Sequence, residues 1–115
     1  MEEGESRVSA KKPTTVRKEL RKSMIENLEA RGLVEPIYID MVNEYLQLWE
    51  RRRLLAEDVR KRGVIVPDKR GGETENRSIS QGTQVSKQML AIYAALGFKE
   101  QAASAVAGAG EDDEL

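Results

Sequence analysis

The sequence predicts a mainly α-helical protein: a helical hairpin with a long central helix, followed by a short β segment and one or two C-terminal helices. Three observations lead to this fold class. Apolar residues recur at every third or fourth position in three separate stretches. The longest stretch contains no helix breaker between Pro36 and Gly63. Each stretch is followed by a glycine, which is the residue that most often caps the end of a helix.

The two ends of the chain differ in composition from its middle. Residues 1–12 are charged with almost nothing apolar, and residues 107–115 combine glycines with acids. Such segments cannot bury enough apolar area to offset the entropy of ordering them. We therefore expect a flexible N-terminal tail at 1–12, one helical domain at 13–106 and a disordered acidic tail at 107–115. A domain of that size has a thin core, for which oligomerisation is the usual remedy.

The composition excludes several kinds of site. The chain has no cysteine and no histidine, which removes disulfides, thiolate nucleophiles, imidazole bases and the metal sites built from these side chains. We therefore expect no metal and no cofactor. No stretch is long and apolar enough for a membrane span, and the N-terminus lacks the apolar core of a secretory signal. These observations favour a soluble intracellular protein with no membrane partner.

The first predicted helix begins at a cap formed by Thr14 or Thr15 and ends at Gly32. Its apolar residues recur at every fourth position, at Val16, Leu20, Met24 and Leu28. On a helical wheel, most of the basic residues of this stretch fall away from Val16 and Leu20. One side of the helix can therefore face a core while the other presents positive charge.

Positive charge is concentrated at the start of this helix, although the net charge of the whole chain is only −1. Residues 7–22 contain seven bases against the single acid Glu19. The local field, and not the sum over the chain, decides what a surface attracts. The pattern indicates either contact with nucleic acid or a solvated helix face. No aromatic residue is interleaved, which disfavours stacking on single-stranded bases.

The second predicted helix runs from Pro36 to about Lys61. Its first half is apolar over roughly 200° of the wheel, whereas one packed face needs little more than about 100°. One neighbouring helix of the same chain cannot cover such an arc, so this half is predicted to contact other copies of the chain. The predicted interface residues are Ile37, Met41, Val42, Tyr45, Leu46, Leu48 and Trp49.

The second half of this helix is charged, with arginine-rich clusters at residues 51–53 and 60–62. Glu50, Glu57 and Asp58 are close enough in sequence to neutralise them, so ion pairs are favoured over DNA contact. Both interpretations remain open at this point.

The remainder of the chain is predicted as shorter elements. Residues 64–66 form a short strand that Pro67 stops, and residues 68–82 form a polar, mobile loop. A third helix starts at Thr83 and ends at Gly97, with Val85, Met89, Ile92 and Leu96 as its apolar residues. An alanine-rich run at 100–107 adds a possible fourth helix.

No catalytic site is expected. The adjacent carboxylates of Glu57 and Asp58 diverge by roughly 100° on a helix. The Gly71-Gly72 pair lacks the spacing of a phosphate-binding loop. The chain is therefore predicted not to be an enzyme.

The order of these elements resembles the small subunit of tailed-phage terminases over roughly residues 14 to 100. The most specific features of the resemblance are the spacing of Asp40, Tyr45 and Gly63 and the turn at residues 96–98. The resemblance implies a ring of identical subunits that binds double-stranded viral DNA in the cytoplasm of the infected bacterial host. It also implies that the ring presents this DNA to a large subunit, which carries the ATPase and nuclease.

Under this interpretation the domain at 13–106 serves both oligomerisation and DNA binding. The residues predicted to contact DNA phosphates without reading sequence are Lys11, Lys12, Arg17, Lys18, Arg21 and Lys22. The alternative is a small coiled-coil regulator or adaptor that dimerises through the second helix and binds a protein partner.

Overall fold

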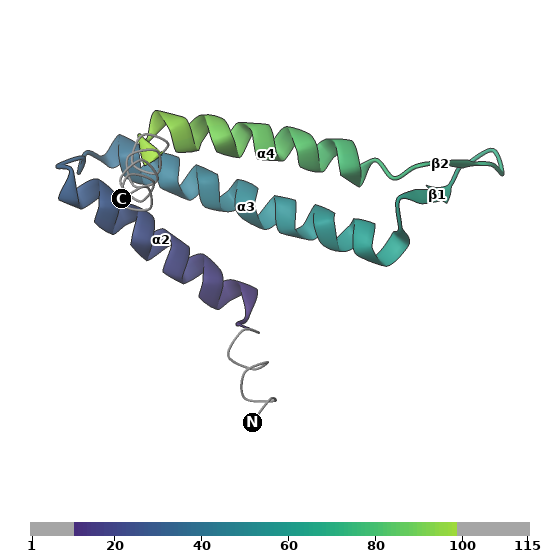
Figure 1. The fold of residues 1–115 in the computed structure, drawn as a ribbon, viewed down its shortest axis with the longest axis horizontal. Coiled ribbons are helices and arrows are strands. Elements are labelled where there is room, and N and C mark those ends of the chain that lie inside the picture. Colours follow the sequence, from purple (N-terminus) through teal and green to yellow (C-terminus); the bar gives the residue numbers. More distant parts are fainter. Residues whose placement is uncertain (1–10, 99–115) are drawn as a thin grey trace, which may run out of the picture. The chain divides into compact units, whose positions relative to one another are not determined.

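A computed structural model describes residues 11–98 of the chain. These residues form three helices and a two-stranded hairpin (Figure 1). The elements are α2 (Pro13–Ala30), α3 (Pro36–Arg62), β1 (Ile65–Pro67), β2 (Glu73–Glu75) and α4 (Ser78–Ala95). The predicted mainly helical fold class is confirmed. The chain divides into two compact units, Met1–Leu46 and Gln47–Leu115, which are described separately below.

Helix α2 starts at Pro13, which is two or three residues earlier than a cap at Thr14 or Thr15 predicted. Its N-cap is Lys12, with no side-chain capping bond, and Pro13 occupies the first turn. The prediction of a threonine cap is therefore wrong, because the fixed φ of proline and its missing N–H suit the first helical position. At the other end Gly32 has a φ of +77°, and its N–H bonds to the Glu29 carbonyl at 3.0 Å. The N–H of Leu33 bonds to the Leu28 carbonyl at 2.9 Å, which completes a Schellman motif and confirms the predicted cap.

The core of the first unit is small. Its buried apolar side chains are Met24, Leu28, Val42 and Leu46, the first two from α2 and the last two from α3. Val16 belongs to the same four-residue repeat as Met24 but is 36% exposed. A strict repeat of four drifts about 40° around the helix at each step, because an α-helix turns once every 3.6 residues. Only the C-terminal half of the apolar stripe of α2 is therefore buried.

Helix α3 has the predicted extent, from Pro36 to Arg62, and stops at Gly63, whose φ is +91°. Beyond Leu46 it runs beside α4 in the second unit (Figure 1). The buried apolar residues of this unit are Val66, Val85, Met89, Leu96 and Phe98. The rings of Tyr93 and Phe98 also pack together, with centroids 5.5 Å apart.

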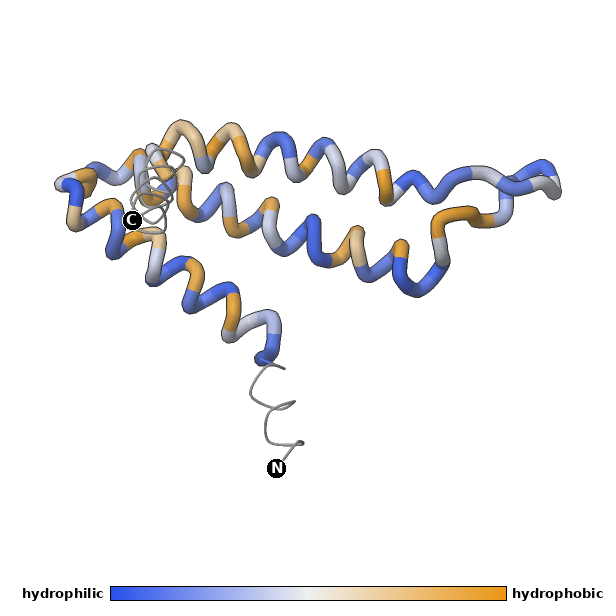
Figure 2. The backbone as a smooth tube through the Cα atoms, viewed as in Figure 1, coloured by the Kyte–Doolittle hydropathy of each residue, from blue (hydrophilic) through white to orange (hydrophobic). Residues whose placement is uncertain are grey.

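The segment between α3 and α4 is a β-hairpin: the short strand predicted at residues 64–66 is present as β1, whereas the predicted loop at 68–82 contains β2 and the start of α4. Strands β1 and β2 are antiparallel, and Pro67 lies within β1 opposite Glu73 instead of stopping the strand before it. Asp68 organises the turn: its side chain accepts the Arg70 N–H at 2.9 Å, its carbonyl accepts the Gly71 N–H at 3.1 Å, and Gly71 has a φ of +90°. Figure 2 shows the hydrophobic stretch leading into β1 beside the hydrophilic β2.

Helix α4 begins at Ser78, so the predicted start at Thr83 is wrong and Gly82 lies inside the helix. The Asn76 side chain accepts the Ser78 N–H at 3.0 Å, which satisfies a backbone donor of the first turn. The predicted end is confirmed, since Gly97 has a φ of +82° and bonds to the Ala94 carbonyl at 3.0 Å. The possible fourth helix at 100–107 and the acidic tail at 107–115 lie outside the described residues, as does nearly all of the predicted N-terminal tail.

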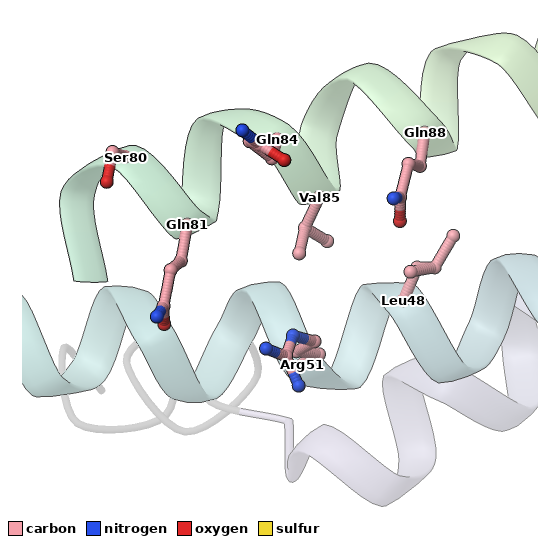
Figure 3. A pocket seen from close by; sticks show the side chains of 7 residues that line it. All are labelled: Leu48, Arg51, Ser80, Gln81, Gln84, Val85 and Gln88. Carbon is pink, nitrogen blue, oxygen red and sulfur yellow. The ribbon is translucent and has the colours of Figure 1, made fainter. Parts of the chain in front are cut away.

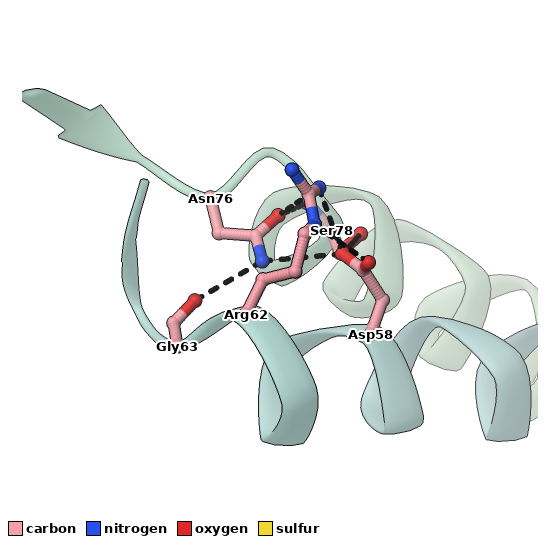
Figure 4. A network of polar contacts seen from close by, with 5 residues as sticks. All are labelled: Asp58, Arg62, Gly63, Asn76 and Ser78. Atoms are coloured by element: carbon pink, nitrogen blue, oxygen red, sulfur yellow. Dashed lines mark hydrogen bonds and ion pairs between the residues drawn. The ribbon is translucent and has the colours of Figure 1, made fainter. Parts of the chain in front are cut away.

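A polar network ties the hairpin and α4 to the end of α3 (Figure 4). Asn76 is fully buried, and its amide nitrogen donates to the Gly63 carbonyl and to the Asp58 carboxylate, both at 3.1 Å. The same carboxylate accepts the Ser78 hydroxyl at 2.7 Å and the Arg62 guanidinium at 2.7 Å and 2.9 Å. Every polar atom of the Asn76 side chain therefore has a partner, as a buried amide requires.

These bonds also shift the ionisation of Asp58. The Arg62 guanidinium, then the Ser78 hydroxyl and the Asn76 amide, hold the pKa of this carboxyl well below its usual range. The folded state therefore binds a proton at this group less tightly than the unfolded state does. Stabilisation by Asp58 is present above the unfolded pKa of about 3.9 and is lost as pH falls below it.

We predict that Asn76→Ala lowers the free energy of unfolding by about 2 to 3 kcal/mol, because it leaves buried donors and acceptors without partners. Urea unfolding followed by circular dichroism measures the change. Asn43→Ala is the matched control: Asn43 is exposed, and its removal should cost less than about 0.5 kcal/mol. Equal losses in the two variants would show that the network does not hold the hairpin in place.

We predict that Asp58→Asn lowers the melting temperature most at neutral pH, and that its difference from the parent protein shrinks as pH falls through about 4. Thermal unfolding at a series of pH values between neutral and acidic gives this difference. Glu44→Gln, at an exposed position on α3, should give a small difference at every pH. A pH-independent difference for Asp58→Asn would contradict the assigned role of the carboxylate.

Candidate nucleic-acid interface

The six cations predicted to contact DNA all lie on or just before the N-terminal half of α2, and all six are exposed. They are Lys11, Lys12, Arg17, Lys18, Arg21 and Lys22. The only acid between residues 11 and 22 is Glu19. Below, we call these six residues the basic half of α2. The seventh base of the sequence pattern, Arg7, lies outside the described residues.

Three of the six cations line one groove of about 400 Å³ within the first unit. Arg17, Lys18 and Arg21 form it together with Thr14 and with Asn43 and Leu46 of α3. The Arg21 Nε donates to the Asn43 side-chain oxygen at 3.2 Å, which orients that guanidinium along the groove. The groove therefore combines cationic and neutral hydrogen-bonding groups, which are the types that contact phosphate and sugar oxygens.

The sequence did not predict that Asn43 and Leu46 belong to this groove. On the helical wheel, Arg17 and Arg21 lie close in angle to the buried Met24 and Leu28, so they face α3 beyond the end of the apolar contact. The sequence did contain a signal for this arrangement, because an apolar repeat of four residues rotates about 40° around the helix at each step. The sequence predicted that the basic residues face away from the core. Part of the basic half of α2, at Arg17 and Arg21, instead lies against α3.

Two of the six cations have acidic neighbours. Lys11 pairs with Glu19 at 3.0 Å, and Lys22 lies 4.0 Å from Glu26. The side chains of both pairs are more than half exposed. Exposed ion pairs contribute little to stability, so a phosphate group can replace the carboxylate at small cost.

The charged second half of α3 is different, because its arginines pair with acids of the same helix. Arg53 bonds to Glu50 at 2.6 Å, Arg60 lies 3.4 Å from Glu57, and Arg62 pairs with Asp58. The bond to Glu50 raises the pKa of Arg53, and the bond to Asp58 raises that of Arg62. The ion-pair interpretation is thus confirmed for these three arginines.

A second groove of about 400 Å³ lies between α3 and α4 (Figure 3). Its wall on α4 is uncharged and mostly polar, with three glutamines beside Ser80 and Val85, and its wall on α3 includes Leu48 and Arg51. Only one cation lines this groove, against three in the groove of α2. The groove of α2 is therefore the better match for a polyanion.

The structure separates the predicted interface residues into two groups. Val42 and Leu46 are buried within the chain itself, at 0% and 1% exposure, so they offer no surface to another copy. Ile37 is 64% exposed. Met41, Tyr45, Leu48 and Trp49 are half-buried. Val42 and Leu46 lie roughly 140° or more around α3 from Ile37. Residues 11–98 therefore bury the side of α3 that bears Val42 and Leu46 and leave Ile37 on another side exposed.

Among residues 11–98, no three carboxylates are placed to hold a metal ion together. No helix in this part of the chain is long and apolar enough to cross a membrane.

Comparison with known proteins adds one match. A model of the family described as "Phage terminase, small subunit" matches residues 18–113. No curated protein and no solved structure matches the chain. The family match includes α2 from Lys18 onward, the whole of α3, the β-hairpin and α4. Because it spans most of the 115 residues, the chain belongs to the family of phage terminase small subunits, whose general role is in packaging viral DNA.

Proposed function

We propose that this chain binds double-stranded viral DNA through the basic half of α2, assembles with copies of itself into a closed ring, and presents the DNA to the large terminase subunit. Small subunits of this family are in general non-catalytic and regulate or bind DNA. The family acts in the cytoplasm of the infected host during packaging, and the proposal places this chain there.

The observation that carries the proposal is the concentration of exposed cations on α2. Six cations and one acid occupy residues 11–22, and three of the cations share a groove with neutral side chains. Lys and Arg at a protein surface bind the phosphate backbone by releasing its counterions, which needs no base contact. This surface therefore favours binding that is strong at low salt and weakly dependent on sequence.

Self-assembly is supported by the apolar residues of α3 that the described part of the chain, residues 11–98, leaves uncovered. Ile37 is 64% exposed, and Met41 and Tyr45 beside it are only half-buried. Exposed apolar groups that gather on one face mark interaction sites. A ring subunit meets two neighbours through different surfaces, so it needs more apolar area than its own core uses.

We predict that the triple variant Arg17→Gln, Lys18→Gln and Arg21→Gln binds duplex DNA weakly and with a flatter salt dependence. If each cation contacts one phosphate, the slope of log K against log salt should fall in magnitude by about 2 to 3. Fluorescence anisotropy with a labelled duplex at several salt concentrations measures the slope.

The control variant removes the same charge elsewhere: Lys69→Gln, Arg70→Gln and Lys87→Gln, all at exposed positions of the hairpin and α4. It should retain the parent slope. If both triple variants lose the same slope, binding does not depend on α2 and the assignment is wrong.

We predict that Ile37→Glu lowers the mass of the assembly, because a charge placed in an apolar contact must be desolvated without a partner. Light scattering at fixed protein concentration gives the mass. Leu54→Glu is the control on the same helix: Leu54 is 50% exposed but lies roughly 100° around the helix from Ile37. A parent protein that is itself only a dimer or trimer would favour the coiled-coil adaptor instead of a ring.

A further inference from the structure

The backbone of β2 has polar groups that point away from its partner strand. Two hydrogen bonds flank the three-residue ladder: the Asn76 N–H to the Val64 carbonyl at 2.6 Å, and the Asp68 N–H to the Gly72 carbonyl at 2.9 Å. Along an antiparallel ladder, bonded pairs alternate with pairs that make no such bonds. Glu73 and Glu75 fall in the unbonded pairs. Their backbone N–H and C=O groups therefore point outward from β2.

The two edges of the hairpin differ in what they can bind. On β1 the outward backbone groups belong to Ile65 and Pro67, and Pro67 has no N–H to donate. Proline is one of the residues that block an edge strand. Among residues 11–98 the sheet has only two strands, and all three residues of β2 are exposed. The edge of β2 is therefore the one that can add a partner through main-chain hydrogen bonds.

The side chains of β2 limit what that partner can be. Glu73 and Glu75 lie on the same face of the strand, because alternate residues share a face. Two copies of β2 paired with each other would bring these acids together, and like charges on paired strands are destabilising. The partner surface must therefore supply positive charge and hydrogen-bonding groups.

The groove in Figure 3, here called the glutamine groove, supplies both. None of the described residues that line it is an acid. Its one cation, Arg51, is exposed and makes no ion pair among residues 11–98, unlike the paired arginines later in α3. Gln81 and Gln88 reach from α4 toward α3, and Arg51 lies between them along the groove. A glutamine amide both donates and accepts, so it can bond to the N–H and C=O groups of a strand edge.

The glutamine groove also matches β2 in length. Gln81 and Gln88 are about 10 Å apart along α4 at 1.5 Å per residue, and a strand of three residues covers about 10 Å. The hairpin of the same chain does not reach this groove, because it extends beyond the ends of α3 and α4 and away from both helices (Figure 1). The matching strand must therefore come from another copy of the chain.

We propose that the edge of β2 from one copy docks in the glutamine groove of the next copy, with its acids beside Arg51 and its backbone bonded to the glutamines. The contact is heterologous, so it repeats from copy to copy and closes into a ring where the rotation allows. It also supports a two-stranded hairpin, which is marginally stable alone. This inference rests on the proposed ring, for which it names two contacting surfaces, and does not depend on DNA binding.

Disulfide cross-linking of the full-length chain tests the contact, because the parent sequence contains no cysteine. Thr74→Cys and Gln84→Cys place one thiol on β2 and one in the groove without removing a charge, and a disulfide needs Cα atoms within about 7 Å. Mild oxidation should give a ladder of covalent multimers on a non-reducing gel, with a linked peptide joining positions 74 and 84 by mass spectrometry. The control pair is Thr74→Cys with Thr83→Cys, because Thr83 is exposed on α4 but lines a different groove. The control should react at least about tenfold more slowly.

Exchanging the charges tests the pairing independently. Arg51→Glu alone, or Glu73→Lys with Glu75→Lys, brings like charges together across the contact. Either change should raise the concentration for half-assembly, measured by light scattering, at least about tenfold. Combining all three substitutions restores opposite charges and should return this concentration close to the parent value. A combined variant that assembles no better than the others would overturn the proposal.

The outcomes separate this contact from the ring and from the site on α2. An oligomer in which both cysteine pairs react equally would overturn the contact and leave the ring in place, whereas a monomeric parent protein would overturn both. Adding Arg17→Gln, Lys18→Gln and Arg21→Gln should leave the link between positions 74 and 84 unchanged. Loss of the link in that variant would assign the acids of β2 to the groove of α2 and overturn the proposal.

Discussion

Helix α3 is the element on which both compact units depend, because each uses a different part of it as one wall of its core. In the first unit Val42 and Leu46 of α3 are buried together with Met24 and Leu28 of α2. In the second unit the remainder of α3 runs beside α4 and ends at the network around Asn76. Neither unit buries more than a handful of apolar side chains. Cores this small give little stability alone. The stability of the fold therefore depends strongly on the continuity of α3 and on the hydrogen bonds of Asn76.

The small size of both cores also links the fold to assembly, because few side chains are available to cover the apolar residues of α3. A helix that supplies walls to both units has apolar residues on several sides, and residues 11–98 do not provide enough partners for all of them. Ile37 remains exposed for this reason, while Val42 on another side of the same helix is fully buried. The proposed ring is one way of covering what the described residues leave open.

The helix ends were predictable from the sequence where a backbone requirement selects the residue. Gly32, Gly63 and Gly97 each have a positive φ, which glycine adopts without strain, and each was identified as an end. The start of α4 was missed because Asn76 precedes it among polar residues that resemble a loop. The N-cap residue is Arg77, which makes no side-chain capping bond, and the Asn76 side chain one position earlier accepts the Ser78 N–H instead. The usual signal is therefore absent at the cap position, and the glycine at position 82 suggested that the helix began later. The first strand of the hairpin was predicted from its apolar residues, but β2 was missed because its residues Glu73–Glu75 are polar and exposed and give no apolar pattern.

The charge of the candidate site could be predicted, but its shape could not. Counting bases along the sequence identified all six cations of the basic half of α2, because local charge density needs no tertiary information. The groove also requires Asn43 and Leu46, which come from another helix and meet Arg21 only in the folded unit. The burial of Val42 and Leu46 within the chain could not be predicted for the same reason, since a wheel shows that an arc is too wide but not which part of it the chain covers. Their place at an interface between copies stays a prediction.

Lysine footprinting of the full-length protein, with and without duplex DNA, tests the central claim most directly. Acetylation at low reagent concentration followed by mass spectrometry gives the reactivity of each lysine separately. If the basic half of α2 binds the phosphate backbone, Lys12, Lys18 and Lys22 lose reactivity when DNA is added, while Lys69 and Lys87 keep it. Protection of Lys69 and Lys87 with unchanged reactivity on α2 would contradict the account.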